Sequence, residues 1–421
     1  MKELYTKTIG AEGWLKFWAL FILGFPYYVF PAGTPQPGDI LISIVILFYI
    51  AKEGIFFEKS FSKHITYFRN LIVYIAIVNI ILFLVRIGYK DKGLSLIVNL
   101  FYLFNFLLFT FSLSLYSKYK KEFIITTVYS VVLSALIQVA LSPYGRISEG
   151  REALFFTNPN QLGYYALSGL TIVLALEKYL KISRAIVFVS FACFFYFTML
   201  CVSKAAIGGM IILIGIYLIS NKILTLRTFF TAAVVGVGLM AAIFKTNVGE
   251  RFVRNLTYRL DYSVKPKDVS EWEYRGYDRM NNHPYYMILG AGEGAFNRFD
   301  TYIENHEMHS SLGTILFCYG IPGSIFFILF ITSLLRGLPL TYSLYILPLI
   351  AYGVAHMGLR FTIFYIALAM FPVARDLIEN GGFDDEEEKS ENEEEEKPKR
   401  RPKYIKPLWM QNPLDKAINR A

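Results

Sequence analysis

Residues 310–335, SSLGTILFCYGIPGSIFFILFITSLL, contain no charged side chain over 26 positions. A helix needs about 20 apolar residues to cross the hydrocarbon core of a bilayer, so this segment is long enough to span one. It lacks the roughly ten-residue alternation of polar and apolar residues that marks a membrane barrel strand. The segment therefore predicts a transmembrane helix.

The same apolar character extends over most of the 421 residues. Hydrophobic residues make up 55% of the chain and charged residues only 18%, which is not the balance of a soluble domain. We predict an all-α, polytopic membrane fold with about twelve transmembrane helices. The expected spans are 14–32, 39–57, 67–88, 93–117, 123–145, 153–176, 185–203, 204–221, 226–245, 310–335, 338–356 and 359–377. They define a transmembrane domain of residues 1–377, with one large loop, residues 246–308, between the ninth and tenth helices.

Lysine and arginine predict the orientation, because short loops rich in them stay in the cytoplasm. With the amino terminus inside, the leader and inner loops hold 16 such residues and the short outer loops hold 7. Both termini are therefore expected in the cytoplasm of a bacterial cell, with the chain in the cytoplasmic (inner) membrane. The large loop then faces the periplasm or the exterior.

Residues 378–421 differ from the rest of the chain. An acidic block, FDDEEEKSENEEEEK, is followed by a basic one, PKRRPKYIKPLW. Such runs cannot bury a core, so we expect a disordered, charged cytoplasmic tail that either solubilises the chain or contacts membrane lipid or a cytoplasmic partner. The net charge of +9 does not indicate nucleic acid binding, because the positive residues are divided among inner loops and this tail.

Two clusters on the outer side could bind an anion. In SPYGRISEGREALFFTNPNQLGYYAL, Arg146 and Arg151 precede the helix start Asn158-Pro159-Asn160. Asparagine as a cap and proline in the first turn are ordinary at a helix start. Together with Arg151, however, the unpaired N–H groups of that turn could hold a phosphate. The second cluster is Ser203-Lys204, where the lysine either reaches the lipid headgroups or adds a charge to the same site.

The third cluster lies in the large loop. Arg275 and Arg279 are one helical turn apart and are expected to share a helix face. The following GAGEGAF, residues 290–296, resembles a nucleotide-binding glycine motif, but no strand precedes it, so we predict a tight loop. His309 opens the next span, and a neutral imidazole with a pKa near 6.5 could act as a general base.

At these residues the chain resembles the superfamily of O-antigen polymerases and O-antigen ligases, bacterial membrane glycosyltransferases. The matching pieces are Arg151 ahead of FTNPNQLGYYAL, the Ser203-Lys204 turn, Arg275 followed by HPYYMILGAGEGAF, and His309 with Gly320 eleven positions later. They cover roughly residues 10–375. Two positions depart from the family pattern: Lys204 stands where the family usually has arginine, and Arg279 where leucine is common.

The resemblance implies a metal-independent, inverting transfer of a glycan from an undecaprenyl pyrophosphate-linked oligosaccharide to an acceptor hydroxyl, with no cofactor. His309 would be the general base, and Arg151 and Arg275 would bind the pyrophosphate. Pyrophosphate is a good leaving group, so cations to stabilise its charge and a base to activate the hydroxyl meet the chemical need. Further candidates for the pyrophosphate are Arg146, Arg279 and Lys204, and secondary candidates for the site are Asn158, Asn160, His306 and His283.

The acceptor remains open at this point. We favour a polymerase of O-antigen, capsule or exopolysaccharide, with a chain-length regulator as a partner, over a ligase that transfers the glycan to lipid A core or protein. A membrane transporter is the more distant alternative, since about twelve helices with both ends inside also suit a carrier. Against a carrier, the largest loop follows the ninth helix, and no Asp or Glu lies near the middle of an expected span.

Overall fold

The computed structural model describes residues 13–31, 33–85, 93–148, 151–180, 182–222, 249–250, 253, 257, 269–299, 301, 303 and 306–382. The expected span 226–245 and residues 383–421 of the charged tail lie outside these ranges. The described chain is mostly helical, in agreement with the sequence. Its α-helices are α2 (Trp14–Gly24), α3 (Pro37–Glu53), α4 (Ser62–Val85), α5 (Leu94–Ala140), α6 (Pro159–Leu176), α7 (Arg184–Cys201), α8 (Lys204–Ser220), α11 (Glu271–Tyr274), α12 (Asp278–Asn282), α13 (Tyr286–Leu289), α14 (Ser311–Leu335), α15 (Leu340–Ser343), α16 (Leu347–Ala355) and α17 (Thr362–Glu379).

Eleven of the twelve expected spans fall wholly or mainly on described residues, and each of these contains all or part of a helix. Four described helical segments are long and apolar enough to cross a membrane: Lys59–Val85, Leu94–Ala140, Arg184–Cys201 and Ser311–Leu335. Shorter apolar helices are Trp14–Gly24, Lys204–Ser220 and Leu340–Ala355. These helices indicate a multi-pass membrane protein, while twelve crossings remain a prediction.

The expected spans 93–117 and 123–145 form one continuous element, α5, with a break inside it. Lys120 has φ 42° and interrupts the helix. Its ammonium group contacts the Glu58 carboxylate, lies 3.3 Å from Asp376 and sits over the Tyr116 ring at 4.6 Å. The break thus falls at the charged segment between two apolar halves, where polar partners stabilise it.

A short β-hairpin is the one departure from an all-α chain in the described residues. Strand β1 (Arg146–Ser148) pairs antiparallel with β2 (Arg151–Leu154). The helix expected from residue 153 consequently begins only at Pro159. Asn158 caps it by accepting a hydrogen bond from Asn160 N at 2.7 Å, and Pro159 occupies the first turn, as the sequence predicts.

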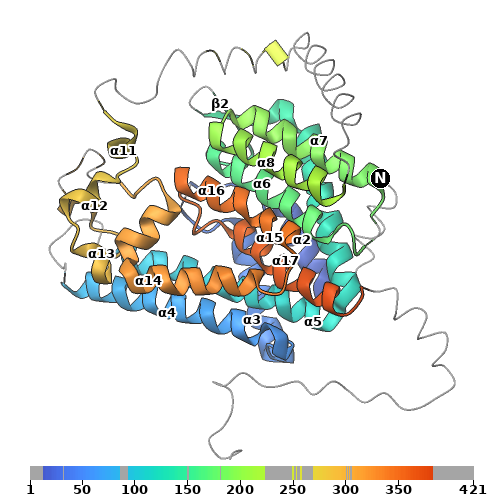
Figure 1. Ribbon diagram of the computed structural model, residues 1–421, viewed down its shortest axis with the longest axis horizontal. Helices are drawn as coiled ribbons and strands as arrows, with labels where there is room; N and C mark the ends of the chain where they lie inside the picture. Colours follow the sequence, from blue (N-terminus) through green and yellow to red (C-terminus); the bar gives the residue numbers. More distant parts are fainter. Residues whose placement is uncertain are drawn as a thin grey trace, which may run out of the picture.

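Helix packing brings the amino-terminal ends of several helices to the same part of the molecule. Helix α4 packs along α14, α13 packs against α14, and α12 and α11 lie progressively farther from this pair on the left of Figure 1. Helix α6 packs against α7, α8 and α17, while α16 contacts α6, α8 and α14. Helix α17 is buried along most of its length. Helix α16 therefore contacts three helices, α6, α8 and α14, that begin next to candidate residues from distant parts of the sequence.

Candidate functional site

Residues 352–356, the last turn of α16 and the residue after it, are here called the α16 end. Three other helices meet it at their amino-terminal ends. From α6, the Asn160 carbonyl accepts a hydrogen bond from Tyr352 Oη at 3.1 Å. Beside α8, Ser203 Oγ lies 3.4 Å from His356 Nε2. At α14, Ser311 N donates to the His356 carbonyl at 3.2 Å. The α16 end therefore joins the three candidate clusters of the sequence.

The three helix starts are all capped by side chains. Asn158, Ser203 and Ser310 each accept a hydrogen bond from a first-turn N–H of their own helix. The amino-terminal end of a helix carries a partial positive charge and further unpaired N–H groups, which favour anions. Three such ends around one point make this region electropositive before any charged side chain is considered.

The hairpin holds Arg151 against the start of α6. The Arg151 side chain is only 6% exposed, and its Nη1 donates to Asn160 Oδ1 at 3.3 Å. Arg146, on the other strand, is exposed and pairs through its backbone with Leu154. Of the two arginines predicted in this cluster, the fold encloses Arg151 at the helix start and leaves Arg146 at the surface.

Arg275 connects the large loop to the α16 end. Its Nη1 donates to the Ala355 carbonyl, and its Nε lies 3.5 Å from the Glu271 carboxylate. The Arg275 carbonyl accepts a hydrogen bond from His309 N at 3.1 Å. The His309 side chain is exposed, with its ring centroid 6.1 Å from that of Tyr274. The backbones of Arg275 and His309 are thus hydrogen-bonded to each other next to the α16 end.

The carbonyl groups of the α16 end are all paired. Gly353 O accepts from Ser310 Oγ at 3.3 Å, Val354 O from Tyr277 Oη at 2.9 Å, and Ala355 O from Arg275. The last four carbonyls of a helix have no partner within the helix, so each must be satisfied from outside. Residues from the loop and from the start of α14 do so here, which fixes Arg275 and the segment around His309 on α16.

The prediction that Arg275 and Arg279 share a helix face is wrong. Gly276, with φ +77°, ends α11 after Arg275, and Arg279 belongs to the separate short helix α12. A positive φ suits glycine and breaks a right-handed helix. The two guanidinium groups therefore do not follow one helix face.

Arg279 is fully buried inside the loop. Its guanidinium donates to Ile303 O at 3.0 Å, to His306 O at 2.8 Å and to Thr301 Oγ1 at 3.3 Å. It also lies over the Phe299 ring at 4.9 Å, and burial lowers its pKa to about 10. Because loop groups occupy both the edge and the face of this guanidinium, Arg279 serves the loop rather than the anion site.

The remaining candidates divide between the site and the loop. Lys204 is exposed at the start of α8, next to Ser203. The His306 side chain is exposed, and its carbonyl accepts from Arg279. His283 ends α12, where its Nδ1 lies 3.2 Å from Tyr285 Oη. Only Lys204 of these three neighbours a residue that contacts the α16 end.

The predicted tight loop GAGEGAF is confirmed, and it fits against a break in α14. Gly320, with φ 64°, interrupts that helix, and Pro322 follows. Ala291 N donates to the Phe317 carbonyl at 3.0 Å, and Gly292 N donates to the Cys318 carbonyl at 2.8 Å. The loop backbone thereby pairs carbonyl groups at the break.

Glu293 and Arg360 form a buried contact near the loop that the sequence did not reveal. Glu293 is 1% exposed and accepts from Tyr102 Oη at 2.7 Å and from Tyr319 Oη. Arg360 Nε lies 3.9 Å from Glu293 Oε2, and Arg360 also contacts the Glu307 carboxylate. These contacts anchor the loop and the residues just before His309 to α5 and α14. Their separation along the chain left no local pattern to find.

His356 was also missed, because a lone histidine between two apolar segments carries no motif. It is half-buried, and its ring lies against that of Tyr352 in a tilted arrangement with the centroids 4.6 Å apart. Its position at the α16 end follows entirely from helix packing.

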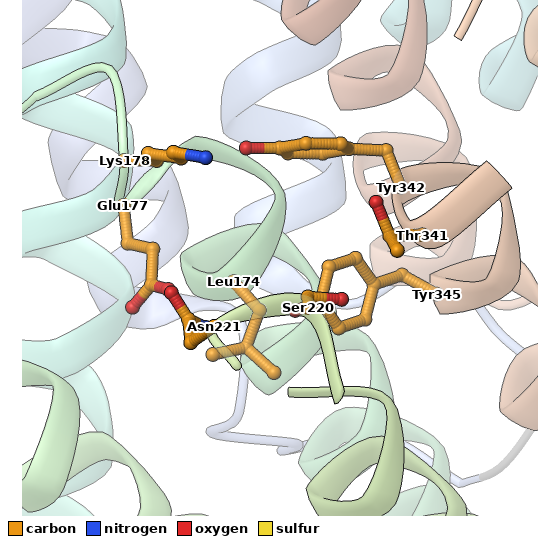
Figure 2. A pocket seen from close by; sticks show the side chains of 8 residues that line it. All are labelled: Leu174, Glu177, Lys178, Ser220, Asn221, Thr341, Tyr342 and Tyr345. Atoms are coloured by element: carbon orange, nitrogen blue, oxygen red, sulfur yellow. The ribbon is translucent and has the colours of Figure 1, made fainter. Parts of the chain in front are cut away.

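A small pocket lies at the opposite end of α6 from Asn158 (Figure 2). Glu177 follows α6, and burial raises the pKa of its carboxyl to about 7. None of the predicted site residues lines this pocket. Its walls are Leu174, Glu177, Lys178, Ser220, Asn221, Thr341, Tyr342 and Tyr345.

The sequence matches no protein-family model and no curated protein. The residues around the α16 end are therefore the basis on which a function can be proposed.

Proposed function

We propose that this chain is a membrane glycosyltransferase that moves a glycan from an undecaprenyl pyrophosphate donor to an acceptor hydroxyl. The observation that carries the proposal is the meeting of three capped helix starts with Arg151, Arg275 and His309 around the α16 end. Cations and helix amino-terminal ends together suit the binding of a pyrophosphate. The imidazole of His309, whose backbone N–H binds the Arg275 carbonyl, suits the role of proton acceptor.

In the proposed reaction, the oxygen of the acceptor hydroxyl attacks the anomeric carbon of the donor sugar, and His309 accepts the proton of that hydroxyl. The bond between that carbon and the pyrophosphate oxygen breaks, and the leaving group departs with the electron pair. A direct attack from the opposite side inverts the anomeric centre. Arg151 and Arg275 stabilise the negative charge that develops on the pyrophosphate, with Lys204 as an additional, exposed cation.

The acceptor we propose is a growing polysaccharide, so that the enzyme acts as a polymerase on the outer side of a bacterial cytoplasmic membrane. Transfer to lipid A core or to a protein, the ligase reaction, would use the same donor site. The two differ in the acceptor alone, and the assay below separates them.

The test is glycan transfer by the full chain in lipid nanodiscs, supplied with undecaprenyl pyrophosphate-linked oligosaccharide. Longer lipid-linked glycans in the absence of another acceptor indicate a polymerase, and products formed only with lipid A core or protein indicate a ligase. His309→Ala should abolish transfer while retaining affinity for undecaprenyl pyrophosphate, because a base is not a ligand of the leaving group. Wild-type transfer rates in this folded variant would rule out His309 as the base.

A further inference from the structure

The imidazole of His356 holds a central position among the candidate site residues. Its Nε2 lies 3.4 Å from Ser203 Oγ, at the start of α8, and its ring is tilted by 40° against that of Tyr352, with the centroids 4.6 Å apart. Tyr352 in turn donates to Asn160, whose side chain accepts from Arg151. The imidazole is thereby connected to two of the three capped helix starts.

The third helix start and the large loop reach His356 through its backbone. The His356 carbonyl accepts from Ser311 N at 3.2 Å and from Ser311 Oγ at 3.0 Å. The preceding carbonyl, that of Ala355, accepts from Arg275. Backbone contacts therefore fix this part of the chain through Ser311 and Arg275, while Ser203 and Tyr352 are the contacts of the imidazole itself.

The chemistry around the imidazole suits a phosphate oxygen. The side chain is half-buried, so it is positioned by its neighbours without being enclosed. The titratable and charged groups on the elements around it include Lys204 at the start of α8, Arg151 beside α6, Tyr164 on α6, Arg275 and Glu271 at α11, His309 just before α14, and Tyr352 on α16. Three of these seven are cations and one is a carboxylate, Glu271, which lies 3.5 Å from Arg275, so their net charge favours an anion.

We propose that His356 is a further ligand of the pyrophosphate group, donating a ring N–H to a phosphate oxygen beside the start of α8. This inference rests on the proposed function, since it assigns a second histidine to the donor site. His309 accepts the proton of the acceptor hydroxyl, whereas His356 binds the pyrophosphate leaving group.

The experiment measures binding to the full chain in nanodiscs with two probes, undecaprenyl pyrophosphate and inorganic pyrophosphate. His356→Phe keeps a ring against Tyr352 but removes both ring nitrogens. It should raise the Kd for both probes about tenfold, the usual effect of losing one charge-assisted hydrogen bond. His356→Gln, which regains an N–H donor, should recover at least half of that loss. Met357→Ala, one residue along, is the matched control and should bind as wild type.

Several outcomes would overturn the proposal. One is a Kd within about twofold of wild type for His356→Phe, and another is an equal loss of affinity in Met357→Ala. A third is a loss of affinity confined to the lipid-linked probe, which would place the contact on the prenyl chain. If His356→Phe does not fold, His356→Leu is measured against the same limits. A wild-type chain that binds neither probe and transfers no glycan would instead defeat the proposed function itself.

Discussion

Arg275 and Arg279 stand four residues apart in one loop, yet their guanidinium groups meet different surroundings. Arg275 remains 27% exposed beside the α16 end, whereas Arg279 is completely buried. Gly276 between them ends the first helix and turns the chain. Sequence spacing predicted a shared helix face, but the backbone turn separates a candidate ligand from a structural residue.

Arg275→Lys should lower the transfer rate by about tenfold or more. A lysine ammonium is a point donor and cannot reproduce the planar, forked geometry with which arginine can contact both the Ala355 carbonyl and a phosphate. Rates would be measured in nanodiscs at saturating acceptor. Arg146→Lys, at the exposed arginine of the hairpin, is the comparison and should stay within about twofold of wild type. Equal losses in both variants would remove the distinction.

Arg279→Met should destabilise the protein rather than alter its chemistry. The substitution leaves the buried Ile303 carbonyl without its donor, at a cost of about 1–3 kcal/mol, and also removes the donor to the part-buried His306 carbonyl. Thermal unfolding in detergent would record the loss. Arg146→Met changes an arginine at the surface and should leave the unfolding temperature nearly unchanged. A stable Arg279→Met protein would contradict the role assigned to this residue.

At the scale of elements, the glycine loop and the break in α14 depend on each other. A Cβ built at Gly290 would lie 2.4 Å from the Cys318 carbonyl oxygen, and one at Gly320 would lie 2.7 Å from Gly290 N. Both glycines also have positive φ, at 104° and 64°. Only residues without a side chain allow the two backbones to approach this closely.

Gly290→Ala and Gly320→Ala should each destabilise the protein, by about 1–3 kcal/mol from backbone strain alone and by more from the steric clash. The double variant should cost less than the sum of the two, because both changes disrupt one contact. Gly215→Ala in α8, where a Cβ would meet nothing within 4 Å, should be neutral or slightly stabilising. Strictly additive losses in thermal unfolding would show that the loop and the helix break are independent.

At the scale of the whole molecule, the candidate site and the pocket of Figure 2 lie at opposite ends of α6. This helix has 18 residues and is therefore about 27 Å long. Glu177 at the pocket end is remote from the proposed chemistry. Its protonation should therefore affect stability but should not change the rate of glycan transfer at the other end.

The raised pKa of Glu177 predicts the direction of a pH effect on stability. Burial raises this pKa from 4.5 to about 7, so between these values the folded chain binds more protons than the unfolded chain. The free energy of unfolding should consequently fall as pH rises from about 4.5 to about 7. Glu177→Gln should reduce this slope and should be more stable than wild type at pH 8. Glu122→Gln, which changes an exposed carboxylate of α5, should retain the wild-type slope.

Much of the helical framework could be predicted because each span is a local property of the chain. Apolar length gave the helices, and Asn158-Pro159 gave the start of α6. The hairpin before α6 could not be predicted, since its strands are short and β2 is held by packing against α6 and α7. Arg279 was misjudged because four-residue spacing describes a helix only where no glycine interrupts it.

The amino-acid sequence by itself determined the membrane character, the positions of most helices, and the residue types available for chemistry. Apolar length and helix caps operate over one or two turns, so they are readable without knowing the fold. Only the tertiary structure decided which of those residues meet, because Arg151, Ser203, Arg275, His309 and His356 come together through the packing of α16 against three distant helices. The same packing buried Arg279 and joined Glu293 to Arg360 across contacts that no local pattern encodes.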